Sequence, residues 1–215
     1  MNQPAVPPPP ERFNFAQHLL GRNAGRSDKL AYIDDHGVLS YGKLADQVRR
    51  MASLLIALGL RREERVLLLM HDCNDWPVAF LGTLYAGMVP VAVNTLLTAD
   101  DYAYMLQHSR ARAAVVSSAL LPVLRAAIGL SVHDLKRVIV ASPDGKPAAN
   151  EPELDLAQML ATREPTNRPA GTSREDPGFW LYSSGSTGRP KGTLHTQGNL
   201  YWTAELYGDQ VLGLR

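Results

Sequence analysis

The sequence of 215 residues predicts an α/β fold in which helices cover a mostly parallel, doubly wound sheet. The first observation is that short apolar runs alternate with helical patterns along most of the chain. The second is that the runs at 65–70 and 89–93 are apolar almost throughout, as expected for strands covered on both faces. We expect right-handed connections between the parallel strands.

The N-terminal part is predicted to form a short helix, a hairpin and a long amphipathic helix. Gly37 can adopt the positive φ that a tight hairpin turn needs. Ser40 is a plausible N-cap for the long helix, whose apolar side chains share one face as far as Leu58. Gly59 can end that helix in the left-handed conformation. The short helix is expected at 13–20, and the hairpin strands at 30–33 and 38–40.

Strands and helices are predicted to alternate after this helix. Asp75 can cap a helix with Pro77 in its first turn. Thr98 and Asp101 have the spacing of a capping box. We expect strands at 65–70, 89–93, 113–116 and 137–140, and helices at about 75–87, 98–108, 119–128 and 154–160. Residues 142–147 are interpreted as a turn, and residues 164–177 as a surface connection.

Composition and charge exclude several classes of protein. The net charge of +1 gives no signature of binding to polyanions, so we expect neither nucleic acid nor an acidic membrane surface as a partner. Cys73 is the only cysteine, which excludes an internal disulfide and fits a reducing, cytoplasmic location. Residues 1–12 are predicted to be a disordered, proline-rich lead-in without the features of a signal peptide. No stretch is apolar for long enough to span a bilayer.

The stretch 179–192 has the chemistry of a phosphate-binding loop. Its apolar start, 179–182, is predicted to be a buried strand. The glycines that follow let backbone N–H groups approach an anion, the hydroxyl groups add donors, and the basic residues add positive charge. Pro190 stiffens the exit of the loop. The predicted phosphate-binding residues are Ser183, Ser184, Gly185, Ser186, Thr187, Gly188, Arg189, Pro190 and Lys191.

Three other interpretations of this loop fit less well. The P-loop of kinases requires a second glycine and a Mg²⁺-binding Ser or Thr, but Pro190 and Gly192 occupy those positions. A nucleophile elbow requires a glycine two residues before its serine, but Ser184 precedes Ser186 at that spacing. A flexible linker would not join an apolar strand directly to Arg-Pro-Lys-Gly. No serine is therefore assigned as a nucleophile and no residue as a metal ligand, so any metal must be held from elsewhere.

The sequence from Tyr182 to Gly192 resembles the signature loop of the adenylate-forming enzymes, which include acyl-CoA and aryl-CoA synthetases, peptide-synthetase adenylation domains and luciferase. Residues 81–94 are similar to a second shared motif, which we interpret as scaffold. Residues 95–106 and 193–207 look like the aryl-CoA branch, and within it the benzoate–CoA ligases. The resemblance extends from about Phe13 to Arg215.

This resemblance implies ATP-dependent activation of an aromatic carboxylate, benzoate or a close analogue, to an acyl-adenylate. Transfer to CoA would then give an aryl-CoA thioester, AMP and pyrophosphate, with ATP, Mg²⁺ and CoA as cofactors. Lys191 and Arg189 would neutralise the β- and γ-phosphates, while Ser186 and Thr187 would donate from their hydroxyl groups. His195 is a second catalytic candidate, although a structural histidine at a helix entry fits equally well.

The resemblance also implies that 13–215 is the N-terminal part of the AMP-binding domain. The adenine- and metal-binding motifs, most of the acyl pocket and the C-terminal domain of such enzymes lie downstream, so we expect the chain alone to have no ligase turnover. Two alternatives stay open: another acid substrate (hydroxybenzoate, aminobenzoate or a fatty acid), or a non-catalytic nucleotide-binding fragment. The oligomeric state is not predicted. Tyr201, Trp202 and Tyr207 could line an aromatic site or pack in the core, and His71 is interpreted as a strand-end residue.

Overall fold

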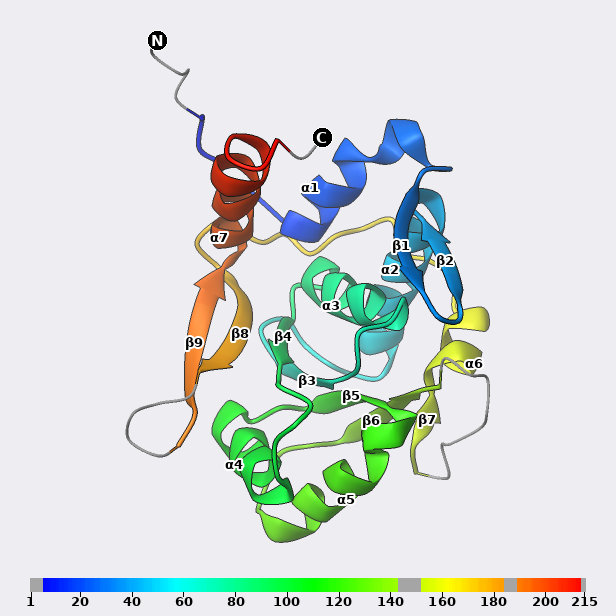
Figure 1. Cartoon of the computed structure of the whole chain (residues 1–215), viewed down its shortest axis with the longest axis vertical. Coiled ribbons are helices and arrows are strands. Elements are labelled where there is room, and N and C mark those ends of the chain that lie inside the picture. The colour runs from blue at the N-terminus through cyan, green and yellow to red at the C-terminus, as the bar shows by residue number, and fades with distance from the viewer. Residues whose placement is uncertain (1–5, 143–151, 184–188, 214–215) are drawn as a thin grey trace.

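The computed structural model describes residues 6–142, 152–183 and 189–213. Its main sheet has seven strands in the order β7-β6-β5-β3-β4-β8-β9, and only the last pair is antiparallel (Figure 1). This architecture confirms the predicted, mostly parallel sheet. The strands are β3 (Arg65–Leu69), β4 (Val89–Ala92), β5 (Ala113–Ser117), β6 (Arg137–Ala141), β7 (Leu154–Asp155), β8 (Pro177–Ser183) and β9 (Lys191–Thr196).

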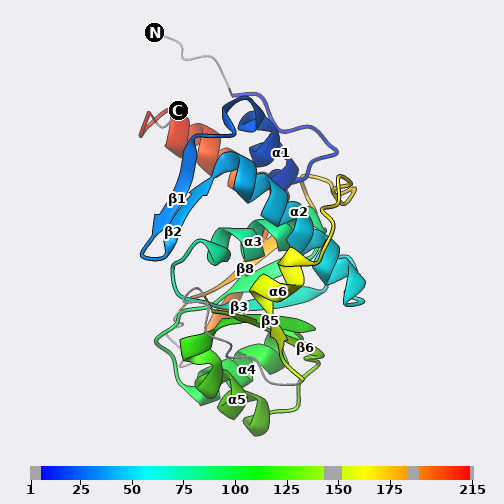
Figure 2. The ribbon, with the colours of Figure 1, turned by 90° about the vertical axis from the view of Figure 1, so that its right-hand side faces the viewer.

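Helices cover both faces of the sheet, as Figures 1 and 2 show. One face packs against α1, α2, α3, α6 and α7, and the opposite face packs against α4 and α5. The bounds are α1 (Phe15–Arg22), α2 (Tyr41–Ala57), α3 (Asp75–Tyr85), α4 (Ala99–Ser109), α5 (Leu121–Leu130), α6 (Leu156–Ala161) and α7 (Gln197–Trp202). A π-helical segment, Thr203–Asp209, continues α7, and short 3₁₀ turns lie at Ala24–Arg26 and Ser118–Leu120.

The alternation of side chains along β3 explains why its sequence is apolar throughout. Val66 and Leu68 belong to the core beneath α2 and α3, whereas Leu67 and Leu69 belong to the core beneath α4 and α5. All four side chains are fully buried. A strand with a core on each face has no solvent-facing position, so it carries no alternating polar residues.

The local signals around α2 are confirmed. The Ser40 hydroxyl accepts a hydrogen bond from the Lys43 backbone N–H at 3.3 Å, which caps the first turn. Gly59, just beyond the helix, has a φ of +86°. The preceding strands β1 (Leu30–Asp34) and β2 (Gly37–Ser40) form the expected antiparallel hairpin as a separate small sheet.

The prediction that Asp75 caps α3 was wrong. Asn74 occupies the N-cap position and makes no side-chain capping bond, while Asp75 is the first helical residue. The Asn74 side chain instead donates to the Gly37 carbonyl at 3.1 Å, and the Asn74 backbone N–H donates to the Asp34 carboxylate at 2.8 Å. The helix start is therefore fixed by contacts with the β1–β2 hairpin, which are distant in sequence.

Two strands were missed by the sequence analysis. The helix expected at 154–160 begins only at Leu156, because Leu154 and Asp155 pair with β6 as the short strand β7. Residues 191–196 were assigned to no strand, yet they form β9, which pairs antiparallel with β8. One edge of β8 pairs with β4, which leaves the other edge free. After the loop, the chain returns along that free edge as β9.

Candidate functional site

The carboxyl ends of three neighbouring strands, β3, β4 and β8, surround a cavity of about 510 Å³. Ligands of open α/β sheets bind in crevices at the carboxyl ends of the strands. The predicted phosphate loop begins at the end of β8, directly beside this cavity. The cavity is lined by Met70, His71, Asp72, Trp76, Ala92, Val93, Asn94, Thr95, Leu181 and Tyr182.

The two ends of the predicted loop are held together by the β8–β9 hairpin. Ser183 is the pairing partner of Lys191, and Tyr182 is the partner of Gly192. The backbone ladder therefore places the first and last candidate residues opposite each other. The predictions for Ser184, Gly185, Ser186, Thr187 and Gly188 fall outside the described residues and stay predictions.

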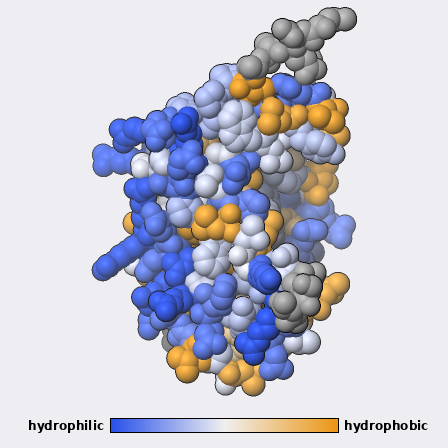
Figure 3. Space-filling model, turned by 90° about the vertical axis from the view of Figure 1, so that its left-hand side faces the viewer, coloured by the Kyte–Doolittle hydropathy of each residue, from blue (hydrophilic) through white to orange (hydrophobic). Residues whose placement is uncertain are grey.

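Lys191 is an exposed cation at the start of β9. Among the described residues, no carboxylate lies within ion-pair distance of its ammonium group. A lysine without a protein counter-charge can neutralise a bound anion without first breaking an internal ion pair. Figure 3 shows the side of the molecule that carries β9, where polar side chains surround small, separate groups of apolar ones.

Arg189, at the loop exit, lies against α4. Its guanidinium carbon is 5.0 Å from the centroid of the Tyr104 ring, within the range of a cation–π contact. Arg189 and Pro190 also line a smaller cavity of about 290 Å³ between the loop exit and α4. The positive charge is therefore present near the loop, but the described contact of Arg189 is with a ring.

His195 is not brought near Lys191. The two residues are four positions apart in β9, or about 13 Å along an extended strand. The His195 ring stacks on Phe179, its cross-strand partner, with centroids 4.5 Å apart and an interplanar angle of 8°. This geometry supports the structural interpretation of His195, which lies in β9 two residues before α7.

The aromatic residues near the C-terminal helix do not line the cavity beside the loop. Tyr201 is buried, and its hydroxyl donates to the Pro7 carbonyl at 2.9 Å. Trp202 packs against it edge-on, with centroids 5.5 Å apart, and Tyr207 is exposed. Of the two interpretations, core packing holds for Tyr201.

Several cavity residues were missed by the sequence analysis. The sequence pattern indicates only a strand end at His71 and only scaffold at 81–94, yet His71 and Asn94 both line the cavity. Their positions in the sequence could have identified them. Both residues directly follow a predicted buried parallel strand, and such residues lie at the carboxyl edge of the sheet, where ligands bind. The Asn94 side chain itself holds the local turn by accepting from the Leu96 N–H at 2.8 Å.

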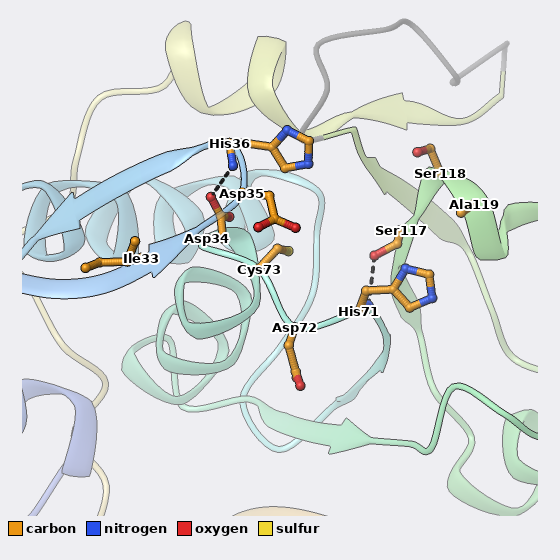
Figure 4. Close-up of a pocket in the computed structure, with 10 residues that line it drawn as sticks. All are labelled: Ile33, Asp34, Asp35, His36, His71, Asp72, Cys73, Ser117, Ser118 and Ala119. Atoms are coloured by element: carbon orange, nitrogen blue, oxygen red, sulfur yellow. Dashed lines mark hydrogen bonds between the residues drawn. The ribbon is translucent and has the colours of Figure 1, made fainter.

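A second cavity of about 510 Å³ lies between the β1–β2 turn and the ends of β3 and β5 (Figure 4). Three aspartates line it, Asp34, Asp35 and Asp72. The Asp34 carboxylate already accepts hydrogen bonds from the backbone N–H groups of Asn74, His36 and Gly37, which lower its pKa. In the described ranges, no group of three or more His, Cys, Asp or Glu side chains is arranged to hold a metal ion. We assign no ligand to this second cavity.

The fold and this loop define a class of protein. Residues 20–213 match the AMP-binding enzyme family, and the chain belongs to that family. This confirms the resemblance identified from the signature loop. In the described part of the chain, no helix has the length and apolar character needed to cross a membrane.

Three individual proteins are similar to this chain over most of its length. The chain is 47% identical to the benzoate–CoA ligase of Thauera aromatica, in a match that covers 100% of this chain and 40% of that protein. The solved benzoate CoA ligase of Burkholderia xenovorans LB400 is 46% identical, with a TM-score of 0.83 over 94% of this chain and 38% of that one. An anthranilate CoA ligase in complex with anthranoyl-AMP is 31% identical, with a TM-score of 0.89 over 96% of this chain and 39% of that one. The chain thus spans about two fifths of the length of these relatives.

Proposed function

We propose that this chain is the nucleotide-phosphate-binding part of an AMP-forming acid–thiol ligase that acts on benzoate or a close analogue. The observation that carries the proposal is Lys191, an exposed lysine with no described counter-charge, held by a β-hairpin beside a cavity at the carboxyl edge of the sheet. Two findings support the reaction class: the chain belongs to the AMP-binding enzyme family, and its sequence is 47% and 46% identical to those of two benzoate–CoA ligases.

The proposed reaction has two steps. A carboxylate oxygen attacks the α-phosphorus of ATP, the bond to the β-phosphate oxygen breaks, and pyrophosphate leaves. The CoA thiol then loses its proton and attacks the acyl carbonyl, and AMP leaves with the former carboxylate oxygen. The first step is needed because an oxide ion is a very poor leaving group, whereas AMP is a good one.

In this scheme the described residues act on the leaving pyrophosphate. The Lys191 ammonium group would stabilise the negative charge that develops on the β- and γ-phosphates. Ser183, its partner across the hairpin, would donate a hydrogen bond from the same end of the site. Because backbone pairing fixes the main chain of both residues, only their exposed side chains would have to be ordered when the phosphates bind.

Mg²⁺ accompanies ATP in the proposed reaction and would screen the phosphate charge. The described residues supply no ready group of ligands for it, so we assign it no protein ligand and no step. We place the enzyme in the cytoplasm, where ATP and CoA are available, and the single cysteine of the sequence agrees with a reducing compartment.

Benzoate is the preferred substrate in this proposal because identity is higher to the two benzoate–CoA ligases than to the anthranilate CoA ligase. A panel of benzoate, 4-hydroxybenzoate, anthranilate and octanoate would test the choice in a chimera that carries residues 20–213 of this chain, assayed beside its Thauera aromatica parent. The highest kcat/KM is expected with benzoate. A higher value with octanoate would exclude an aromatic acid as the preferred substrate.

The phosphate site is tested by calorimetric titration of Mg·ATP into the chain. We expect saturable binding that weakens at least about tenfold in Lys191→Ala, as for the loss of one charge-assisted contact. Lys43→Ala is the matched control, because Lys43 is an exposed lysine on α2, and it should leave the affinity unchanged. Equal affinities for the wild type and Lys191→Ala would contradict the role of Lys191.

The reaction is tested in a chimera in which residues 20–213 replace the matching part of the Thauera aromatica benzoate–CoA ligase. The folded chimera should form benzoyl-CoA and AMP from benzoate, ATP and CoA. The 215-residue chain alone should form neither. A folded chimera without benzoate-dependent release of AMP, or benzoyl-CoA made by the chain alone, would count against the proposal.

A further inference from the structure

We propose that Tyr104 and His108 of α4 are positioning residues that hold the two ends of the phosphate loop in place. The proposal rests on the function proposed above, and it concerns residues that do not themselves contact substrate. It follows from side-chain contacts on both sides of the loop, each made by the same helix.

The entrance of the loop is joined to His108. The Nδ1 atom of His108 lies 2.8 Å from the hydroxyl oxygen of Tyr182, within hydrogen-bond distance. The two rings meet edge to face, with centroids 5.7 Å apart and an interplanar angle of 66°. Burial raises the pKa of Tyr182, so its phenol stays protonated at neutral pH and keeps a hydrogen to donate.

The exit of the loop is joined to Tyr104. The guanidinium group of Arg189 lies over the Tyr104 ring, 5.0 Å from its centroid. Tyr104 and His108 are one helical turn apart, and their rings stack with centroids 5.3 Å apart and an interplanar angle of 27°. One turn of α4 therefore contacts Tyr182, directly before the residues predicted to bind phosphate, and Arg189, near the end of that set.

The helix that carries these two rings is itself well fixed. A capping box between Thr98 and Asp101 closes its first turn, and Tyr102, Met105 and Leu106 are buried beneath it. Side chains one turn apart on its other face can thus act as a rigid support for the hairpin. Trp180 of β8 completes the contact, with its ring centroid 6.1 Å from that of His108.

The consequence concerns phosphate binding rather than folding. Without these rings, the β8–β9 ladder would still pair Ser183 with Lys191, but the Tyr182 and Arg189 side chains would lose their anchors on α4. Phosphate-binding groups that are less well held must be ordered when the nucleotide binds, which weakens binding. We expect no such dependence for binding of the carboxylate substrate, because the family resemblance places most of the acyl pocket downstream of this chain.

Hydrogen exchange of the 215-residue chain measures the anchoring directly. In Tyr104→Ala and His108→Ala, the amides of 181–183 and 191–193 should exchange about tenfold faster, while those of β3 and β5 stay unchanged. Tyr104→Phe keeps the ring and should restore slow exchange. His36→Ala, at an exposed histidine in the β1–β2 turn, is the matched control and should change nothing in the hairpin.

Either of two results would overturn the proposal that Tyr104 and His108 hold the β8–β9 hairpin. Unchanged hairpin exchange in both alanine variants would show that the rings do not hold the hairpin. Faster exchange throughout β3 and β5 would show that they support the whole sheet instead.

Kinetics of the chimera separate this inference from the proposed function. The KM for Mg·ATP should rise about tenfold in Tyr104→Ala and His108→Ala, should return towards the wild-type value in Tyr104→Phe, and the KM for benzoate should stay unchanged. Equal increases in both KM values would overturn the positioning role. A folded, unsubstituted chimera that releases no AMP would refute the proposed function, whereas the exchange experiment would still decide the anchoring.

Discussion

The two stretches that resemble shared motifs of the family, 81–94 and 182–192, differ most in burial. The first forms the end of α3 and the buried strand β4, and Leu84 and Val91 are fully buried within it. In the second, both described basic residues, Arg189 and Lys191, are exposed. Sequence similarity alone does not separate these roles. Packing accounts for the first motif, whereas the exposed residues of the second are explained by the phosphate binding that we propose for it.

In the buried motif, even the hydroxyl group of Thr83 makes its hydrogen bond inside the protein. Thr83 has no exposed surface, and its hydroxyl donates to the Ala79 carbonyl at 2.7 Å within α3. Its own backbone carbonyl accepts from the Met88 N–H at 3.0 Å. Only the end of this motif, at Ala92 to Asn94, reaches the cavity. Most of it therefore acts on stability, and its effect on the site is indirect.

The largest effect on stability is expected at Gly82. An added Cβ would lie 2.5 Å from the Cβ and Cγ of the fully buried Met51, where α3 crosses α2. Gly82→Ala should therefore reduce the free energy of unfolding by about 1–3 kcal/mol, although alanine is the better helix former. Urea denaturation measures the change.

Gly21→Ala is the matched control for this substitution, because Gly21 is also helical but has no atom within 4 Å of an added Cβ. It should be neutral or stabilising by up to about 1 kcal/mol. If both variants became more stable, close packing would not be the reason for glycine in this motif.

An intermediate effect is expected in α4, which joins the buried part of the molecule to the exposed loop. Thr98→Ala removes the hydroxyl that accepts from the Asp101 N–H at 3.3 Å and donates to its carboxylate at 2.7 Å. We expect a loss of about 1 kcal/mol of stability, measured by urea denaturation. A change below about 0.3 kcal/mol would mean that tertiary packing alone fixes the helix start.

The same capping box predicts a dependence on pH. Hydrogen bonds from the Thr98 hydroxyl and then from its backbone N–H lower the pKa of Asp101. The folded state therefore gains stability from the ionised carboxylate above the unfolded value of about 3.9, and that stability is lost as the pH falls through the lower folded value. Asp101→Asn should be less stable than the wild type at pH 6, and the difference should shrink towards pH 2. If the stability difference between Asp101→Asn and the wild type grew as the pH fell, the pKa of Asp101 would be raised in the folded state and not lowered.

The smallest effect on stability is expected at Lys191. Its side chain is exposed, and no ion pair of it is found in the described part of the chain. Lys191→Ala should change the free energy of unfolding by less than about 0.5 kcal/mol, while Mg·ATP binding weakens at least about tenfold. Thermal denaturation without nucleotide is the measurement. A loss of 2 kcal/mol or more would show that Lys191 has a structural role as well.

The alternation of strands and helices can be predicted from the sequence alone, because buried parallel strands and amphipathic helices have different apolar periods. The sequence also determined features set by neighbouring residues: the Ser40 cap, the Thr98–Asp101 capping box and the helix end at Gly59. It also predicts the phosphate loop, since glycine, hydroxyl and basic residues at that spacing have a direct chemical meaning. These signals are local, so one stretch of chain is enough to express them.

Contacts between stretches that are distant in sequence became visible in the three-dimensional structure and could not be predicted beforehand. Strand β9 exists because β8 has an edge to pair with, and the start of α3 depends on a hairpin about 40 residues earlier, through the contact between Asn74 and Asp34. The contacts of Tyr104 with Arg189 and of His108 with Tyr182 join residues more than 70 positions apart. Such contacts leave no pattern in either stretch alone, because packing selects the partner after both elements have formed.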